Sequence, residues 1–221
     1  IYHIMIKGRI FMDLSQNVTR EKIIRATISF IEKYGIHSVT IRGIAKEADV
    51  NSAAINYYFR SKENLLEETL KLTIKNFQDD YYAIAQKQYQ NPGELLQAIL
   101  FYLLAGSTRY PGITKAHLYE SFVNNDHTNF SSRLFKKLLN LLVDKISELD
   151  MEKDKNDIRM SVTQLISAVL MPSLFSGLFK DFVGLDLKDE NAQKKYVSNL
   201  INHYYHVDKG LESWHPGPMD Q

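Results

Sequence analysis

Residues 40–62 read TIRGIAKEADVNSAAINYYFRSK and predict two short helices joined by a turn of about three residues. Such helices pack at a steep angle only when apolar side chains fill the inside of the corner, as we expect of Ile44, Ala48, Val50, Ile55 and Phe59. The small Ala45 lets the backbones approach, and Asp49 takes the turn position, where glycine is commoner but aspartate tolerates a left-handed backbone. The spacing therefore predicts a helix-turn-helix, rather than a plain corner inside an all-α protein.

The second helix of such a unit lies in the DNA major groove, with its N-terminal residues toward the bases. Asn51, Ser52 and Ala53 are short enough for close approach, although Ser52 also suits an N-cap. Asn56 can pair with adenine or bind phosphate. Tyr57 is expected to point outward to a phosphate.

The remaining DNA-binding candidates flank this helix. Tyr58 suits the core of the corner and a phosphate contact equally well. Thr40 and Arg42 open the first helix, where amide groups and a guanidinium suit phosphate, although Arg42 can also serve as an ion-pair partner. Lys62 stands at the start of the following helix.

The rest of the chain also reads as helix, and we find no convincing strand pattern. Thr19 is the expected N-cap of a first helix that Gly35 ends, and Ser61 the cap of a long helix to residue 89. Further helices are expected at 92–110, 113–124, 129–149, 157–180 and 189–207. The predicted fold is all-α, with an N-terminal three-helix DNA-binding domain and a C-terminal helical domain for ligand binding and dimerisation. The expected divisions are an extension at 1–18, the helix-turn-helix domain at 19–76, the effector-binding and dimerisation domain at 77–207 and a tail at 208–221.

Composition and charge agree with this division. The 221 residues contain no cysteine, which excludes disulfides and thiolate chemistry. Residues 1–76 hold 12 basic and 8 acidic side chains, whereas residues 77–221 hold 15 and 18, so the front is the half suited to a polyanion. The sequence contains no apolar run of about 18 residues, and residues 1–16 lack the residue order of a secretion signal. We therefore expect a cytoplasmic protein that does not contact the membrane.

Residues 19–70 resemble the N-terminal domain of TetR-family transcriptional regulators. The resemblance rests on Gly35, Thr40, Ile44-Ala45, Ala48, Val50 and the run YYFRSKENL, in matching order and spacing. Many members carry Tyr at the position of Asn56, which leaves the base preference open. The resemblance implies a homodimer, a helical C-terminal domain and a small-molecule inducer.

The helices of the back half are rich in aromatic residues, which usually form core but can also line a pocket between helices. The candidate effector contacts are Phe101, Tyr102, His117, Tyr119, Phe122, Met171 and Phe175. The last two long helices carry apolar stripes, which suit either a two-fold dimer of four helices or the core of one subunit.

Other chemistry finds little support. His203 and His206 share a helix face, but two ligands rarely make a metal site, and no Ser-His-Asp order, phosphate loop or HExxH pattern is present. We therefore expect no enzyme activity, cofactor or metal. The predicted function is a ligand-responsive DNA-binding transcriptional regulator, a repressor that a small apolar or amphipathic effector releases from a palindromic operator. The alternative is a DNA-binding or partner-binding helical protein without an effector.

Overall fold

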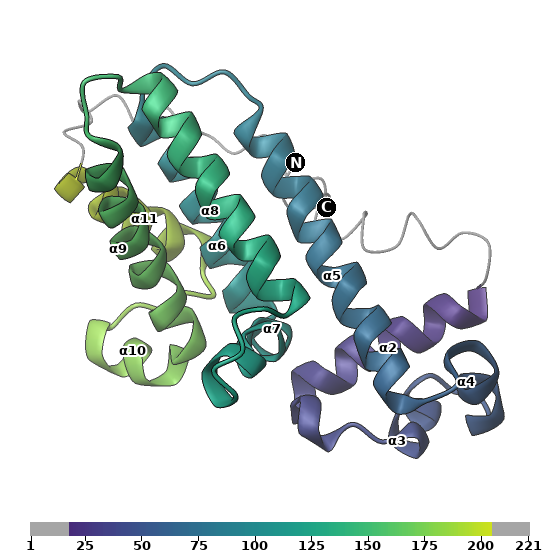
Figure 1. The fold of residues 1–221 in the computed structure, drawn as a ribbon. Helices are drawn as coiled ribbons and strands as arrows, with labels where there is room; N and C mark the ends of the chain where they lie inside the picture. Colours follow the sequence, from purple (N-terminus) through teal and green to yellow (C-terminus); the bar gives the residue numbers. More distant parts are fainter. Residues whose placement is uncertain (1–17, 205–221) are drawn as a thin grey trace.

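The computed structural model describes residues 18–204, apart from the side chain of Val183, and the expected N-terminal extension and C-terminal tail lie almost wholly outside this range. The described chain is helical and forms two groups of helices that α5 connects (Figure 1). The first group contains α2 (Val18–Tyr34), the 3-10 turn η1 (Ile36–Ser38), α3 (Ile41–Glu47), α4 (Ser52–Phe59) and the start of α5 (Lys62–Ala85). The second contains the rest of α5, α6 (Pro92–Arg109), α7 (Pro111–Val123), α8 (Phe130–Leu149), α9 (Lys155–Leu174), α10 (Ser176–Val183) and α11 (Glu190–Tyr204).

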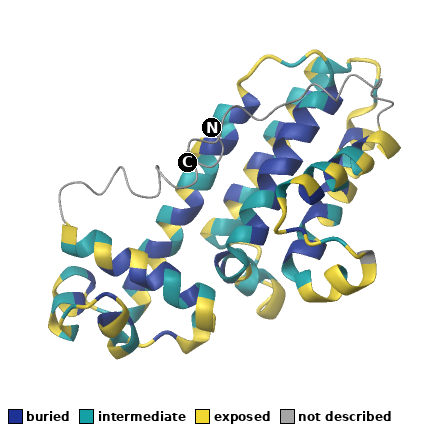
Figure 2. Cartoon of the chain, turned by 180° about the vertical axis from the view of Figure 1, so that it is seen from behind, coloured by how far each residue is buried: buried dark blue, intermediate teal, exposed yellow. Residues whose placement is uncertain are grey.

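Each group has its own apolar core, and Figure 2 shows buried residues along the inner faces of the helices. The first core joins α2, α3, α4 and the beginning of α5, and it also includes Ile113 and Ala116 of α7. The second core is centred on α6, which packs against α9 and α11, while α8 packs against α5 and α9. Helix α7 therefore contributes to the core of the first group while lying beside the second.

Local signals explain most helix ends. Gly35 follows α2 with φ 80°, a conformation that glycine adopts at little cost. The hydroxyl of Ser61 accepts a hydrogen bond of 3.1 Å from the backbone N–H of Asn64 at the start of α5. Asn91 caps α6 in the same way, directly before Pro92 at the first helical position. These three expected boundaries are confirmed.

Three expected boundaries are wrong. Thr19 is no N-cap, because it lies within α2, which already includes Val18. The long helix ends at Ala85 rather than near 89, and the hydroxyl of Tyr89 folds back to donate to the carbonyl of Ile84 at 2.9 Å. The helix expected at 157–180 stops at Leu174, and α10 continues after a bend of 98°.

The end of α9 contains Pro172, which cannot donate a backbone hydrogen bond to the carbonyl of Ala168. The hydroxyl of Tyr196 in α11 donates to that carbonyl instead, at 2.8 Å. This hydrogen bond joins α11 to α9 at the point where Pro172 interrupts the backbone hydrogen bonds of α9. Within residues 18–204, no helix alone meets the length and hydropathy of a membrane span, although the bent pair α9–α10 meets them jointly.

Candidate nucleic-acid interface and effector cavity

Helices α3 and α4 form the steep corner that the sequence predicts. Ile44, Ala48, Ile55 and Phe59 are at most 1% exposed, and Val50 is half-buried. The turn places Asp49 at φ 48°, and the N–H of Val50 donates to the carbonyl of Ala45 at 3.0 Å. The helix-turn-helix is thus confirmed, including the left-handed conformation at Asp49.

The two short helices are capped by side chains that were also candidates for DNA contact. The hydroxyl of Thr40 accepts from the N–H of Gly43 at 3.0 Å, and the carbonyl oxygen of the Asn51 side chain accepts from the N–H of Ala53 at 2.8 Å. Asn51, rather than Ser52, is therefore the N-cap of α4, while Ser52 is its half-buried first residue. Both capping side chains are exposed and lie at helix N-termini, where the backbone amides favour anions.

One face of α4 is open. Ala53, Asn56 and Tyr57 are exposed, Tyr57 to 80%. Tyr58 is half-buried beside the core of the corner and packs edge-on against the Tyr57 ring, with centroids 5.0 Å apart. Tyr58 thus positions Tyr57, which stands outward as expected, and their roles at DNA stay predictions.

Basic side chains flank this open face. Arg42 is exposed in the first turn of α3, and Lys62 is the half-buried first residue of α5. Arg60 was missed as a site candidate, although it belongs to the YYFRSK run. It is exposed between α4 and α5 at φ 65° and ψ −43°, a conformation that non-glycine residues rarely adopt.

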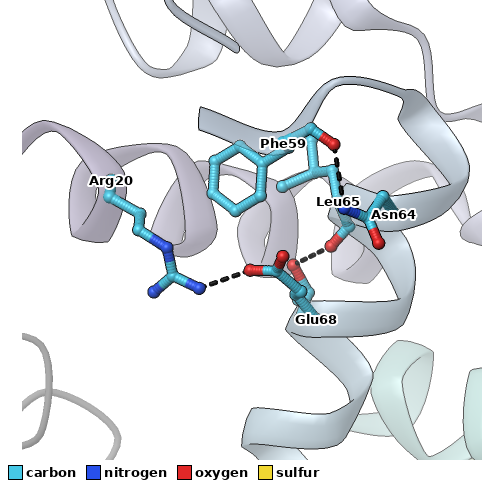
Figure 3. Close-up of polar contacts among 6 residues, drawn as sticks. Arg20, Phe59, Asn64, Leu65 and Glu68 are labelled. Atoms are coloured by element: carbon cyan, nitrogen blue, oxygen red, sulfur yellow. Dashed lines mark hydrogen bonds and ion pairs between the residues drawn. The ribbon is translucent and has the colours of Figure 1, made fainter. Parts of the chain in front are cut away.

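The base of α4 is fixed by contacts from α2 and α5, which Figure 3 shows in close-up. Arg20 of α2 forms an ion pair with Glu68 of α5, and its guanidinium lies 5.4 Å from the centroid of the Phe59 ring. The side-chain amide of Asn64 donates to the carbonyl of Phe59 at 3.0 Å. The last turn of α4 is thereby held to the rigid long helix, which gives the open face a fixed orientation.

The C-terminal group of helices encloses a cavity of about 460 Å³, a volume usual for small-molecule sites. Residues of α5, α6, α7, α8 and α9 line it together with Ile28 of α2, and most of the lining is apolar. Phe77, Tyr102 and Phe135 contribute aromatic walls, and the rings of Phe77 and Tyr102 stack with centroids 5.6 Å apart. The volume and lining suit an amphipathic organic molecule.

One polar network in the cavity joins three helices through His117 of α7. The hydroxyl of Thr73 in α5 donates its one hydrogen to the carbonyl of Leu70 at 3.0 Å. The same hydroxyl lies 2.9 Å from Nε2 of His117, and because its hydrogen is already used, it acts there as the acceptor. Nε2 therefore carries the hydrogen, and Nδ1 accepts from the hydroxyl of Ser131 in α8 at 2.9 Å. Burial lowers the pKa of His117 to about 4, which keeps the ring neutral in this arrangement.

A second polar group lies further along α5. The hydroxyl of Tyr102 donates to Oδ2 of Asp80 at 3.2 Å, and Asp80 is only 3% exposed. Burial, and then the negative charge of Asp80, raise the pKa of Tyr102, so the phenol stays protonated and remains a donor. Asn76, one turn before Asp80, also lines the cavity, and its buried Nδ2 has no hydrogen-bond partner.

The seven effector candidates fall into two sets. Tyr102 and His117 line the cavity, whereas Phe101, Tyr119, Phe122, Met171 and Phe175 do not. Phe101 is buried on another face of α6, and Tyr119 packs on His37 with ring centroids 4.3 Å apart. The other three are more than half exposed. Aromatic content does not predict the lining, because the facing of each helix decides which aromatic residue points inward.

The missed cavity residues include Thr73, Asn76, Phe77 and Asp80. They recur at positions i, i+3, i+4 and i+7 of α5 and so share one helix face. The spacing of the polar residues Thr73, Asn76 and Asp80 on the inward face of α5 is visible in the sequence and could have predicted a polar cavity wall. Within the described part of the chain, no cluster of three or more His, Asp or Glu residues is placed to hold a metal.

Helix α7 links the cavity to the helix-turn-helix group. Both carboxylate oxygens of Glu32 in α2 accept backbone hydrogen bonds at the first turn of α7, from Gly112 at 2.9 Å and Ile113 at 2.7 Å. Burial raises the pKa of Glu32, although these amides and the charge of Lys115 act against that rise. The same helix carries His117 and Ile113 on the cavity wall.

Comparisons with known proteins agree with this geometry. Residues 23–69 match the family model of bacterial regulatory proteins of the tetR family. The chain is 41% identical over 54 residues to the HTH-type transcriptional regulator BetI of Vibrio campbellii (strain ATCC BAA-1116), which is 24% of this chain and 27% of that protein. BetI of Yersinia pestis (strain Pestoides F) is 38% identical over 61 residues, or 28% of this chain and 31% of that protein. The matched region thus spans less than a third of these curated relatives.

Solved structures extend the likeness to the fold of nearly the whole chain. The fatty acid degradation regulator FadR from Bacillus halodurans has a TM-score of 0.61 at 21% identity, covering 84% of this chain and 96% of that one. The ketosteroid transcriptional regulator KstR2 of Mycobacterium tuberculosis has a TM-score of 0.64 at 15% identity, and the match covers 85% of this chain and 95% of that one. AibR, solved with isovaleryl coenzyme A and operator DNA, has a TM-score of 0.62 at 14% identity, and the match covers 84% of this chain and 97% of that one. Residues 23–69 therefore carry a helix-turn-helix of the tetR-family type, and the described chain shares the fold of these solved regulators.

Proposed function

We propose that the chain is a ligand-responsive repressor that binds a palindromic operator as a homodimer and leaves it when a small amphipathic molecule fills the cavity. The observation that carries the proposal is the pairing of an open, fixed α4 face with an apolar cavity in one chain. AibR, a relative in fold solved with both a ligand and operator DNA, supports this pairing.

At DNA, α4 enters the major groove. Asn56 and Ala53 face the base edges, while Tyr57, Arg42, Lys62 and Arg60 contact phosphates on either side. The exposure of these side chains and the capped helix N-termini support this assignment. Contacts to phosphate set the position of the protein, and contacts to base edges set the sequence preference.

The dimer forms through the outer faces of α9 and α10. Most of the apolar stripe predicted on α9 serves the core of its own subunit, since Val162, Leu165, Ile166 and Val169 are buried. A different set of apolar side chains remains exposed on these helices: Met160, Met171, Phe175, Leu178 and Phe182. Large apolar side chains gathered on one surface are typical of protein interfaces, and a two-fold pairing here joins two helix-turn-helix units for successive major grooves about 34–36 Å apart.

Ligand and DNA communicate through α7. A ligand in the cavity touches α7 at His117 and Ile113, and α7 is fastened to α2 by Glu32. A ligand that prefers one position of α7 therefore prefers one position of the helix-turn-helix. A coupling of about 1–3 kcal/mol is typical of such linkage.

Selection of bound fragments from a genomic library tests the DNA half of the proposal, and fluorescence anisotropy then gives the affinity for the selected operator. A screen for molecules that release the operator tests the effector half. Recovery of a palindrome with half-sites one helical turn apart is expected. Failure to enrich any sequence, or enrichment of a single half-site bound by a monomer, contradicts the proposal.

A further inference from the structure

The cavity meets solvent at a basic rim. Of the residues that line it, Lys136 of α8 and His127 of the segment before α8 are exposed, while all the others are buried or half-buried. An exposed lining residue marks the place where a cavity opens. The opening therefore lies beside α8, and both side chains that mark it are of basic types.

Lys136 stands at the edge of an apolar helix face. Phe135 and Leu139 of α8 also line the cavity, and the helical period places Lys136 about a quarter turn from Phe135. The stem of a lysine covers apolar surface while its ammonium stays in water. Within residues 18–204, no ion pair or hydrogen bond engages this ammonium. Lys136 can thus bind a ligand head group at the rim without losing another contact.

The chain around Lys136 is basic. Residues 127–143 contain three Lys or Arg and no Asp or Glu. Asp126 directly precedes them, and its Oδ1 accepts two hydrogen bonds of 2.7 Å within its own loop. Nε2 of His127 is occupied by the side-chain oxygen of Asn125 at 2.9 Å. The α8 side of the opening therefore favours an anion, chiefly through Lys136.

The interior of the cavity offers an anion no comparable partner. His117 is hydrogen-bonded to Thr73 and Ser131 and is neutral, since burial lowers its pKa to about 4. Asp80 is an acid that is 3% exposed and accepts from the hydroxyl of Tyr102. A charged group carried among the apolar walls would lose its water. A ligand with a negative charge is therefore bound best with the charge at the rim and the apolar body inside.

Resting on the effector role of this cavity, we propose that it binds amphipathic anions, in which an apolar chain ends in a carboxylate or another small anionic group. The chain lies against Phe77, Tyr102 and Phe135. The anionic group lies at the rim, where the ammonium of Lys136 donates to it. A cationic head group on the same chain is bound less tightly.

Direct binding to the full-length protein without DNA tests the sign of the preferred charge. The probes are decanoate, decanol and decylammonium, which share one carbon chain and differ in the charge of the head group. We expect decanoate to bind about tenfold more tightly than decylammonium at low salt, because an exposed cation attracts one and repels the other. Added salt should narrow this gap and leave decanol unchanged, since exposed charges are screened. Titration calorimetry gives the dissociation constants.

One variant assigns the preference to Lys136. Lys136→Gln removes the charge but keeps most of the stem, and we expect it to weaken decanoate about fivefold while decanol binds as before. Lys137→Gln is the matched control, because it removes the same charge from the next residue of α8, which is exposed and does not line the cavity. The Lys137 ammonium lies 5.8 Å from the centroid of the Tyr82 ring instead. Melting temperatures check that both variants fold.

Decylammonium binding as tightly as decanoate at low salt overturns the inference, and so does a failure of all three probes to bind. An equal loss of decanoate affinity in Lys136→Gln and Lys137→Gln also overturns it, because such a loss reflects net charge and not a contact at the rim. Operator release is measured separately. A cation that binds more tightly than decanoate and releases the operator leaves the proposed function standing without this inference. Decanoate that binds through Lys136 with no effect on DNA leaves the inference standing without the regulatory function.

Discussion

The carboxylate of Glu32 in α2 accepts a hydrogen bond of 2.7 Å from the backbone amide of Ile113 in α7, a residue 81 positions later in the chain. The companion bond from Gly112 means that one side chain satisfies two of the amides that a helix leaves unpaired at its N-terminus. The positive end of the α7 dipole also favours the charge of this carboxylate. The junction between the DNA-binding and cavity-bearing helices is therefore polar and specific.

Replacement of Glu32 by Ala is expected to uncouple the two halves of the protein. It leaves two backbone amides unpaired at the junction, which costs about 1–3 kcal/mol of folding free energy. Urea denaturation measures that loss, and anisotropy with labelled operator measures DNA affinity with and without ligand. We expect operator binding to persist while its response to ligand falls.

The matched control is Glu67→Ala on α5, which removes an exposed carboxylate that pairs with the neighbouring Lys71. It should leave both stability and coupling nearly unchanged. A full ligand response in Glu32→Ala would show that the signal reaches the DNA-binding helices by another route.

The contact between α2 and α7 also depends on a glycine. A Cβ atom on Gly112 would lie 2.7 Å from the carbonyl oxygen of Ile31 and 2.8 Å from the Cα of Glu32, and both are backbone atoms that cannot rotate away. Gly112→Ala is therefore expected to push the helices apart and lower the unfolding free energy by about 1–3 kcal/mol. Gly106→Ala in α6 meets nothing within 4 Å, so it should raise the unfolding free energy by about 0.5–1 kcal/mol. Equal effects of the two substitutions in urea denaturation would contradict this account.

The sequence predicted the helix-turn-helix closely because its determinants are local. The cap at Thr40, the turn at Asp49 and the buried Ile44, Ile55 and Phe59 act within about twenty residues, and periodicity alone reveals them. The sequence also predicted most of the other helices, and the observed first residues of α6 to α9 and α11 lie within two residues of the predicted ones. The break at Phe175 was missed because an interior proline does not by itself say whether a helix bends, ends or continues.

The cavity was harder to predict, because its lining depends on how six helices turn relative to one another. Aromatic residues were the wrong guide, since Phe122 and Phe175 point to solvent while Thr73, Asn76 and Asp80 point inward. The link from Glu32 to α7 joins residues about eighty positions apart, and single-sequence periodicity holds no information on such pairs. Local chemistry thus specifies the helix-turn-helix, whereas tertiary packing specifies the cavity.

The buried His117 predicts a pH dependence of stability. Its pKa in the folded protein is about 4, below the usual 6.5, so between these values the unfolded chain binds more protons than the folded one. The stabilising contribution of the neutral ring is present above pH 6.5 and is lost as the pH falls toward 4, at most about 3 kcal/mol. His117→Gln retains an amide donor for Thr73 but does not titrate. Urea denaturation at several pH values should show the wild type losing stability faster than this variant on acidification, and parallel curves would contradict the assignment.

Arg60 predicts a conflict between stability and DNA affinity. Its backbone at φ 65° and ψ −43° is strained for any residue with a Cβ atom, whereas glycine adopts such positive φ values readily. Arg60→Gly is therefore expected to raise the unfolding free energy by about 1 kcal/mol while weakening operator binding. Denaturation and anisotropy on the same variant measure both effects. A stabilised variant with full DNA affinity would exclude Arg60 from the interface.

The open face of α4 predicts how DNA affinity responds to salt and to sequence. Tyr57→Phe removes one hydroxyl from an 80% exposed ring and should weaken all DNA sequences alike, because a phosphate contact carries no base information. Arg42→Ala should do the same and also flatten the dependence of log affinity on log salt by about one counterion. Asn56→Ala should instead change the preference between operator variants, since we propose that its exposed amide contacts base edges. Anisotropy titrations over a salt series with two operator variants separate these outcomes. A salt slope that Arg42→Ala leaves untouched would exclude Arg42 of α3 from the DNA-binding surface, and a sequence preference that survives Asn56→Ala would exclude Asn56 of α4 from the base contacts.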